Sequence, residues 1–220
     1  MDRTSDMDPT SEIRGSTASP PAELAIFPLN TVLFPGGVLP LRIFEARYMD
    51  MARDCMAAQV PFGVCLITAG GEVGEPAEHE AIGCEARIVD WDMQQLGLLQ
   101  LRTIGGRRFR VSTRRVQPDG LVRAAVEPIP DDPDLPIPGE LAVCASLVGR
   151  LIEDLVEKET DPMKKMIEPP YRLDSATWVG NRLCEFLPIS SKARQRLMAL
   201  DDPLTRLSVI HQYLQQHRVV

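Results

Sequence analysis

The sequence predicts an α+β protein in which a β-barrel lobe with one packed helix precedes a C-terminal helical bundle. In residues 23–127, short apolar runs bordered by glycine and proline, together with alternating apolar and polar residues, indicate strands. In residues 139–217 the apolar residues recur every three or four positions, which is the period of helices. Residues 128–138 contain five prolines and three aspartates and favour neither element. We therefore expect two lobes joined by a proline-rich linker.

The β lobe begins after a different kind of segment. Residues 1–22 are rich in Ser, Thr, Asp and Pro and poor in apolar residues, so they cannot bury enough surface to offset the entropy of ordering. We predict a disordered tail there. Within the lobe, Tyr48, Met51 and Cys55 follow the helical period, which predicts one helix from Glu45 to about Ala58. We expect strands at Leu24–Leu29, Val38–Ile43, Phe62–Ile67, Ala81–Trp91, Gly97–Ile104, Arg108–Arg114 and Leu121–Val126.

Several strands at short spacing around one helix predict a closed or partly closed antiparallel barrel, because closure removes exposed sheet edges. The helical lobe starts with an apolar stripe that runs from Leu141 to a helix end near Glu159. A proline-interrupted loop, Thr160–Leu173, follows. Ser175, Ser190 and Asp202-Pro203 then carry the side chains expected at the starts of three more helices.

Composition places the chain among cytoplasmic globular proteins. Of its 220 residues 44% are hydrophobic and 25% are charged, and the net charge of −7 argues against a chain that coats nucleic acid or anionic lipid as a whole. Five scattered cysteines without a CxxC pair predict free, buried thiols in a reducing compartment. No apolar run has signal-peptide or membrane-span length, so we expect no membrane partner.

Three patches of sequence together resemble one protein family, the N-terminal substrate-binding domain of the ATP-dependent Lon proteases. They are Pro28-Leu29 with Val32-Leu33-Phe34-Pro35-Gly36 and Pro40 to Tyr48 (PLRIFEARY), Gly105 to Phe109 (GGRRF), and Trp178-Val179 with Leu187-Pro188 and Asp202 to Leu207 (DPLTRL). The resemblance implies a PUA-like β lobe, a helical lobe and a role in engaging unfolded polypeptide. The chain contains no GxxxxGK[ST] phosphate-binding loop, so neither ATP hydrolysis nor proteolysis is implied for this stand-alone form.

A direct search for chemistry predicts no enzyme. Two of the three histidines, His211 and His217, lie six apart and share no helix face, and His79 sits in an acidic loop. Ser190-Ser191-Lys192 is better explained as a helix cap and a surface lysine than as a catalytic pair. We therefore expect no catalytic residue, no cofactor and no metal site.

Two binding surfaces are predicted instead. The first is the apolar part of the 160s loop, where methionine suits varied peptide partners; its alternative is packing of the loop across the two lobes. Its residues are Met163, Met166, Ile167 and Tyr171. The second is an arginine-rich face between Arg102 and Arg123, where Arg108, Arg110 and Arg114 share one strand face if no bulge intervenes. A basic face is what RNA binding requires, although no aromatic residues interleave for base stacking.

The alternative for these arginines is pairing with the acidic segments Glu72–Glu80 or Asp131–Asp134. Glu45 and Arg47 also have two interpretations, gripping a peptide or fixing the helix to the barrel, and the second is favoured. The sequence thus predicts a non-catalytic polypeptide-binding module, acting as an adaptor or a chaperone-like regulator of proteolysis. Its partners would be unfolded protein segments and a protease; RNA binding by the Arg102–Arg123 face is the alternative. Ligand identity and oligomeric state do not follow from the sequence.

Overall fold

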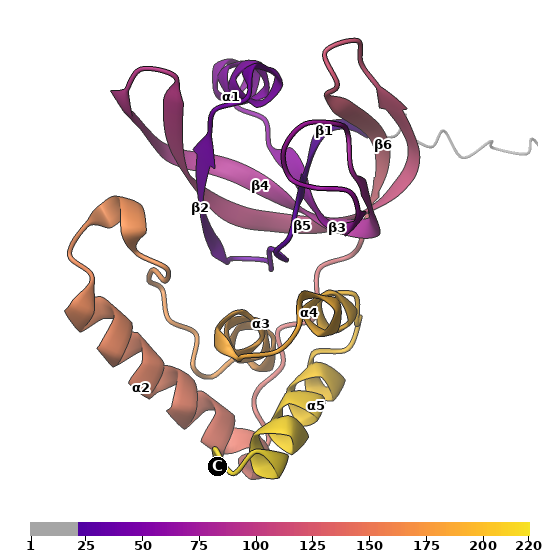
Figure 1. Cartoon of the computed structure of the whole chain (residues 1–220). Coiled ribbons are helices and arrows are strands. Elements are labelled where there is room, and N and C mark those ends of the chain that lie inside the picture. The colour runs from indigo at the N-terminus through magenta and orange to yellow at the C-terminus, as the bar shows by residue number, and fades with distance from the viewer. Residues whose placement is uncertain (1–21) are drawn as a thin grey trace, which may run out of the picture.

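The computed structural model describes residues 22–220, and its β-rich part lies above its main helical part (Figure 1). The predicted disordered tail, residues 1–22, falls outside the described residues apart from Ala22. One helix, α1 (Ala46–Ala58), lies on the outer side of the strands. The C-terminal helices are α2 (Ala142–Lys158), α3 (Ala176–Phe186), α4 (Ser191–Met198) and α5 (Pro203–Gln216). This arrangement confirms the predicted α+β class.

Six strands form the sheet, and five of them close into a ring. The strands are β1 (Ala22–Leu29), β2 (Val38–Ile43), β3 (Phe62–Ala69), β4 (Glu78–Gln95), β5 (Leu98–Val116) and β6 (Val122–Pro128). Their order is β2-β5-β4-β3-β1-β6, and β6 also pairs with β5, which closes the ring. The expectation of a wholly antiparallel barrel is wrong in one place, because β1 runs parallel to β3. The connection between them contains β2 and α1, which provides the long crossover that parallel pairing needs.

Helix α1 covers the barrel with the apolar stripe that predicted it. Tyr48, Met51, Ala52 and Cys55 are all buried in one cluster with the inward side chains of the strands. The rings of Tyr48 and Phe27 lie 4.2 Å apart, which joins the first turn of the helix to β1. Burial of this stripe, rather than helix propensity alone, holds α1 in place.

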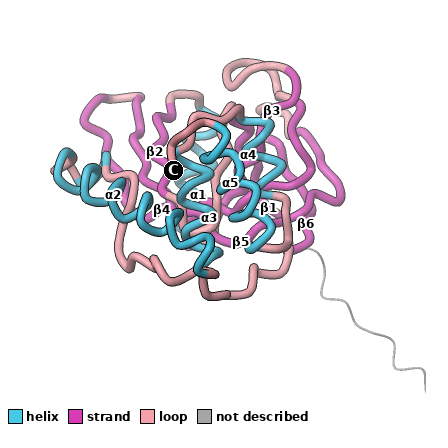
Figure 2. The backbone as a smooth tube through the Cα atoms, turned by 90° about the horizontal axis from the view of Figure 1, so that it is seen from below, coloured by secondary structure: helices cyan, strands magenta, loops and turns pink. Residues whose placement is uncertain are grey.

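The helical lobe begins its last three helices at the predicted caps. Ser175 Oγ accepts a hydrogen bond from the Trp178 N–H, and Ser190 and Asp202 cap α4 and α5 in the same way. The loop before α3 contains one short 3-10 turn, Pro162–Lys164. Figure 2, viewed from below, shows these helices lying across one end of the strands.

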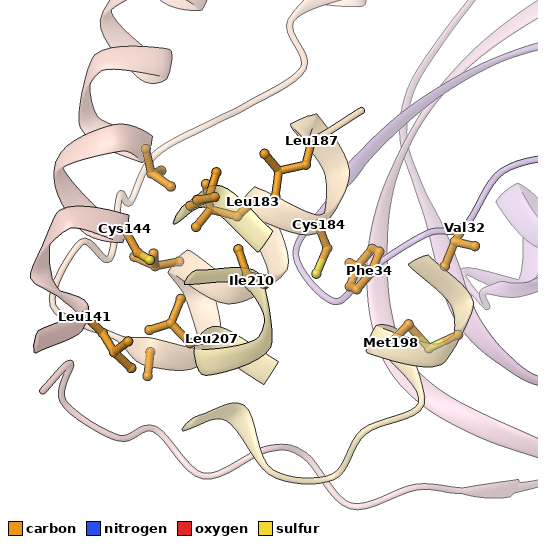
Figure 3. Close-up of a cluster of buried hydrophobic side chains, with 14 of the residues drawn as sticks. Val32, Phe34, Leu141, Cys144, Leu183, Cys184, Leu187, Met198, Leu207 and Ile210 are labelled. Atoms are coloured by element: carbon orange, nitrogen blue, oxygen red, sulfur yellow. The ribbon is translucent and has the colours of Figure 1, made fainter. Parts of the chain in front are cut away.

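One hydrophobic cluster spans the two lobes. Phe34, from the connection between β1 and β2, is fully buried in the cluster formed by the helical lobe. Figure 3 shows its ring beside Cys184 of α3, with Val32 of the same connection near Met198. The junction is therefore packed like a protein interior. Truncating Phe34 would leave a cavity between the two lobes.

Polar contacts reinforce this junction. The Arg182 guanidinium, buried in α3, donates to the Pro35 carbonyl at 2.9 Å and to the Gly36 carbonyl at 2.5 Å. The Gly36 N–H of the same turn donates to the Gly105 carbonyl of β5 at 2.8 Å. The PGG turn that was predicted from sequence is thus the point where the β lobe rests on α3.

Residues 128–138, predicted as a linker, run along the junction and place one buried carboxylate there. The Asp132 side chain is 4% exposed and contacts Arg108 at 2.5 Å and Arg206 at 2.6 Å. The division of the chain at this segment into two lobes stays a prediction.

Candidate functional site

A groove of about 320 Å³ runs beside β2 in the β lobe. Five consecutive residues, Leu39 to Ile43, line it. Side chains of a strand alternate between the two faces of a sheet, so a groove that all five line follows the edge of the strand. The apolar side chains that line it are Phe27, Leu29, Leu39, Leu41, Ile43 and Phe44. Phe44 and Val73 on its rim are 56% and 60% exposed, so the groove presents apolar surface to solvent.

The edge of β2 that borders this groove carries free backbone groups. Among the described strands β2 pairs with β5 only, so its other edge has no partner. Such an edge accepts an extended peptide by main-chain hydrogen bonds. Pro40 in the middle of β2 lacks an N–H and is tolerated only at an edge, where it also limits uncontrolled strand pairing.

The β4–β5 hairpin extends the exposed apolar surface. Leu96 at its tip is 95% exposed and Trp91 is 56% exposed. Trp91 lies opposite Leu101 of β5, and Leu101 lies opposite Leu41 of β2, so the three share one face of the sheet. Leu101 is fully buried, so Trp91 and the groove lie on one face of the sheet but are separate patches of exposed apolar surface. The hairpin at Asp92–Leu96 follows from the sequence, but the groove and the exposed apolar side chains beside it were not predicted, because they depend on which strands become neighbours.

Glu45 and Arg47 at the end of the groove have the structural role that was favoured. Arg47 is buried, pairs with Glu45 at 2.9 Å and donates to the Gly120 carbonyl, which ties α1 to the turn before β6. Its guanidinium also lies 4.6 Å from the centre of the Tyr48 ring. Burial raises the pKa of the Tyr48 hydroxyl, against the opposing charge of Arg47.

The four predicted residues of the 160s loop do not form one exposed surface. Ile167 is buried in the helical core, whereas Met166 and Tyr171 are exposed and Met163 is half-buried. The buried guanidinium of Arg102 donates to the Lys165 carbonyl and pairs with Glu168, so the loop also contacts the β lobe. The alternative of packing across the lobes thus describes part of this loop, and peptide binding by its exposed part stays a prediction.

The predicted arginine face is wrong as a continuous solvent-exposed surface. Arg108 is buried and binds Asp132 and the Met198 carbonyl, because α4, the segment after it and the linker cover that part of β5. A register shift between Val111 and Thr113 breaks the strand alternation before Arg114. Arg114 is paired with Glu78, which is the intramolecular pairing considered as the alternative. Arg110 alone of the three is exposed without an ion-pair partner in the described chain.

The cysteine thiols are shielded from solvent in the described part of the chain. All five cysteines are buried, and burial raises the pKa of Cys65 and Cys184 to about 12, so neither is a ready thiolate. In residues 22–220 no three His, Cys, Asp or Glu side chains gather where they could hold a metal ion. No helix in this part of the chain is both long and apolar enough to span a bilayer.

Comparison with known proteins places this geometry in a family. Residues 23–216 match the ATP-dependent protease La (LON) substrate-binding domain. The crystal structure of a Lon N-terminal domain protein from Xanthomonas campestris is 38% identical, with a TM-score of 0.71 over 87% of this chain and 98% of that one. The N-terminal domain of Mycobacterium avium complex Lon protease shares the fold at 14% identity and a TM-score of 0.57, over 89% of this chain and all of that one.

A more distant similarity covers part of the chain. Cereblon of Danio rerio and of Gallus gallus are 30% and 31% identical over 103 residues, which is 46% of this chain. The matched segment spans 23% and 22% of those proteins, so the chain corresponds to less than a quarter of either. The family match covers nearly all of the described residues, and it agrees with the resemblance found in the sequence. The chain therefore belongs to the family of Lon substrate-binding domains.

Proposed function

We propose that this chain is a non-catalytic module that binds unfolded or extended polypeptide segments. The observation that carries the proposal is the apolar groove that follows the free edge of β2. The family supports it, since the matched domain is a substrate-binding one and the most similar structure described above is a Lon N-terminal domain protein. A folded protein hides both its backbone groups and its apolar side chains, whereas an unfolded segment offers both.

In this mode an extended segment lies along β2 and forms main-chain hydrogen bonds with its outer edge. Alternate side chains of the segment enter the groove and contact Leu39, Leu41 and Phe44. Selectivity for sequence is low, because main-chain bonds are common to all peptides and most of the groove is apolar; the charged side chains of Arg42, Glu45 and Glu72 also line it. Trp91 and the exposed part of the 160s loop, Met163, Met166 and Tyr171, are second contacts for longer segments.

Binding of this kind suits an adaptor or a chaperone-like regulator that passes unfolded chains to a protease. The cytoplasm is the compartment we assign, because the five cysteines are free thiols. RNA binding is the less favoured function. Its predicted face loses Arg108 to the junction and Arg114 to Glu78, so Arg110 is not part of a continuous row of free arginines along β5 that could track phosphates.

The test is titration of a labelled, reduced and unfolded protein, followed by fluorescence anisotropy. Phe44→Ala should weaken binding up to about tenfold, because truncating an aromatic residue that a partner covers costs about 1–2 kcal/mol. Val73→Ser should weaken it by a smaller factor. Val116→Ser is the matched control, since Val116 is similarly exposed but lies outside the groove.

Two results would reject this site. One is the absence of saturable binding by the unvaried protein. The other is a Phe44→Ala variant that binds as tightly as the unvaried protein while Met166→Ser or Tyr171→Ser loses binding, which would move the site to the 160s loop.

A further inference from the structure

A second cavity, of about 350 Å³, opens at the junction between the lobes. Arg110 lines it from β5, and Lys192 and Arg196 line it from α4. Lys192 and Arg196 are four residues apart and therefore lie on the same side of their helix. Three cations from two lobes thus surround one cavity, and Glu80 is the one carboxylate that lines it.

Within residues 22–220 these cations differ from their neighbours in having no ion-pair partner. On the same strand as Arg110, Arg108 is paired with Asp132 and Arg114 with Glu78. By contrast, no carboxylate in residues 22–220 forms a salt bridge with Arg110, Lys192 or Arg196. In a chain with a net charge of −7, three unpaired positive groups around one cavity create a local field that attracts anions.

The cavity wall also carries apolar and amide groups. Gln195 is buried, and its Nε2 donates to the Ile82 carbonyl at 2.8 Å, which fixes the amide orientation. Its Oε1 is a buried acceptor with no hydrogen-bond partner among the described residues. An unsatisfied acceptor is costly, and because this oxygen is shielded from solvent, the N–H of a bound peptide group could satisfy it only if the Gln195 side chain shifts. Ile82 itself adds apolar surface to the wall.

We infer that this cavity binds an acidic segment of polypeptide, rich in Asp or Glu. The side-chain carboxylates would pair with Arg110, Lys192 and Arg196, while the segment's backbone and Cβ atoms contact Gln195 and Ile82. The lining contains no aromatic side chain on which a nucleic-acid base could stack, which disfavours RNA or single-stranded DNA as the occupant. The inference rests on the proposed function, because it adds a charge preference to polypeptide binding.

The test compares a short labelled peptide rich in glutamate with its glutamine counterpart, by anisotropy at low and at physiological salt. The acidic peptide should bind more tightly, and salt should weaken it. Each of Arg110→Gln, Lys192→Gln and Arg196→Gln should weaken binding up to about fivefold, the factor that corresponds to an ion pair of about 1 kcal/mol, and the triple variant should weaken it further. Arg150→Gln is the control, because Arg150 is exposed on α2 and has no ion-pair partner in the described chain.

Three outcomes would overturn the inference. They are equal affinity for the two peptides, an unaltered affinity in the triple variant, and tighter binding of a single-stranded oligonucleotide that the same variants weaken. A neutral apolar peptide separates the two proposals, since the triple variant should bind it normally and Phe44→Ala should not. Circular dichroism of each variant checks that the fold is retained.

Discussion

Replacing Asp132 by alanine should destabilise the whole protein, because this carboxylate neutralises two buried guanidinium groups. Its oxygens lie 2.5 Å from Arg108 and 2.6 Å from Arg206. Both arginine side chains are almost completely buried, so solvent cannot replace the lost carboxylate. Each arginine also donates to main-chain carbonyls around Leu200, and these bonds remain in the variant.

Removing one partner of a buried ion pair costs about 3–5 kcal/mol, because the remaining charge stays buried without compensation. Two arginines are affected, but both keep their hydrogen bonds to main-chain carbonyls. We therefore expect the free energy of unfolding to fall by an amount within this range. Since domains are stable by about 5–15 kcal/mol, the variant should lose a large part of its stability. Asp134→Ala is the control, because Asp134 belongs to the same segment but its carboxylate is exposed, where it contacts Ser175 and pairs with Arg172, so its removal should cost much less.

Urea unfolding followed by tryptophan fluorescence measures both variants. The two tryptophans, Trp91 in the β lobe and Trp178 in the helical lobe, report on the two parts separately when either is replaced by phenylalanine. The transition of Asp132→Ala should move to lower urea for both probes. A loss below about 1 kcal/mol, or one equal to that of Asp134→Ala, would refute the role assigned to this carboxylate.

Three further predictions test the packing. Burial raises the pKa of Glu185 to about 7 from an unfolded value of 4.5, so the folded protein holds this proton more tightly and is stabilised at low pH. That stabilisation is lost as the pH rises through 7, and the free energy of unfolding should fall by about 2–3 kcal/mol between about pH 5 and pH 8. Glu185→Gln should flatten this pH dependence. The five buried thiols should resist Ellman's reagent until the protein is unfolded, as their raised pKa values require. Gly105→Ala should cost about 3 kcal/mol in urea titrations, since its Cβ would lie 2.1 Å from the Phe34 carbonyl, whereas Gly139→Ala, in open space, should be neutral.

Sequence predicted the local parts of this fold well. The caps at Ser175, Ser190 and Asp202 depend on hydrogen bonds within three residues, and all three are confirmed. The bounds of β2 are those predicted, because Gly37 and the change to helical period define its ends. The parallel pairing of β1 and β3 was missed, since partner choice in a sheet depends on long-range topology that periodicity does not contain.

The candidate site was less predictable for the same reason. The groove beside β2 exists because no other described strand pairs with that edge; Pro40 within Val38–Ile43 is compatible with an edge strand but does not show which side chains would gather beside it. Arg108 and Arg110 are equivalent in the sequence pattern, yet one is covered by the linker and α4 while the other lines an open cavity. The buried role of Arg182 likewise had no signal, because a single arginine in a helix is usually exposed.

The packed junction bears on how this module would recognise its ligands. Rotating the lobes apart would expose Phe34 and move Arg108 of β5 away from Arg206 of α5, so Asp132 could no longer pair with both, and such a motion would cost several kcal/mol. The groove beside β2 lies within the β lobe, and the basic cavity lies across this rigid junction. Both surfaces are therefore preformed, and binding at either requires no closure of the lobes. The conformational adjustment must come from the ligand, which favours segments that are already extended or unfolded.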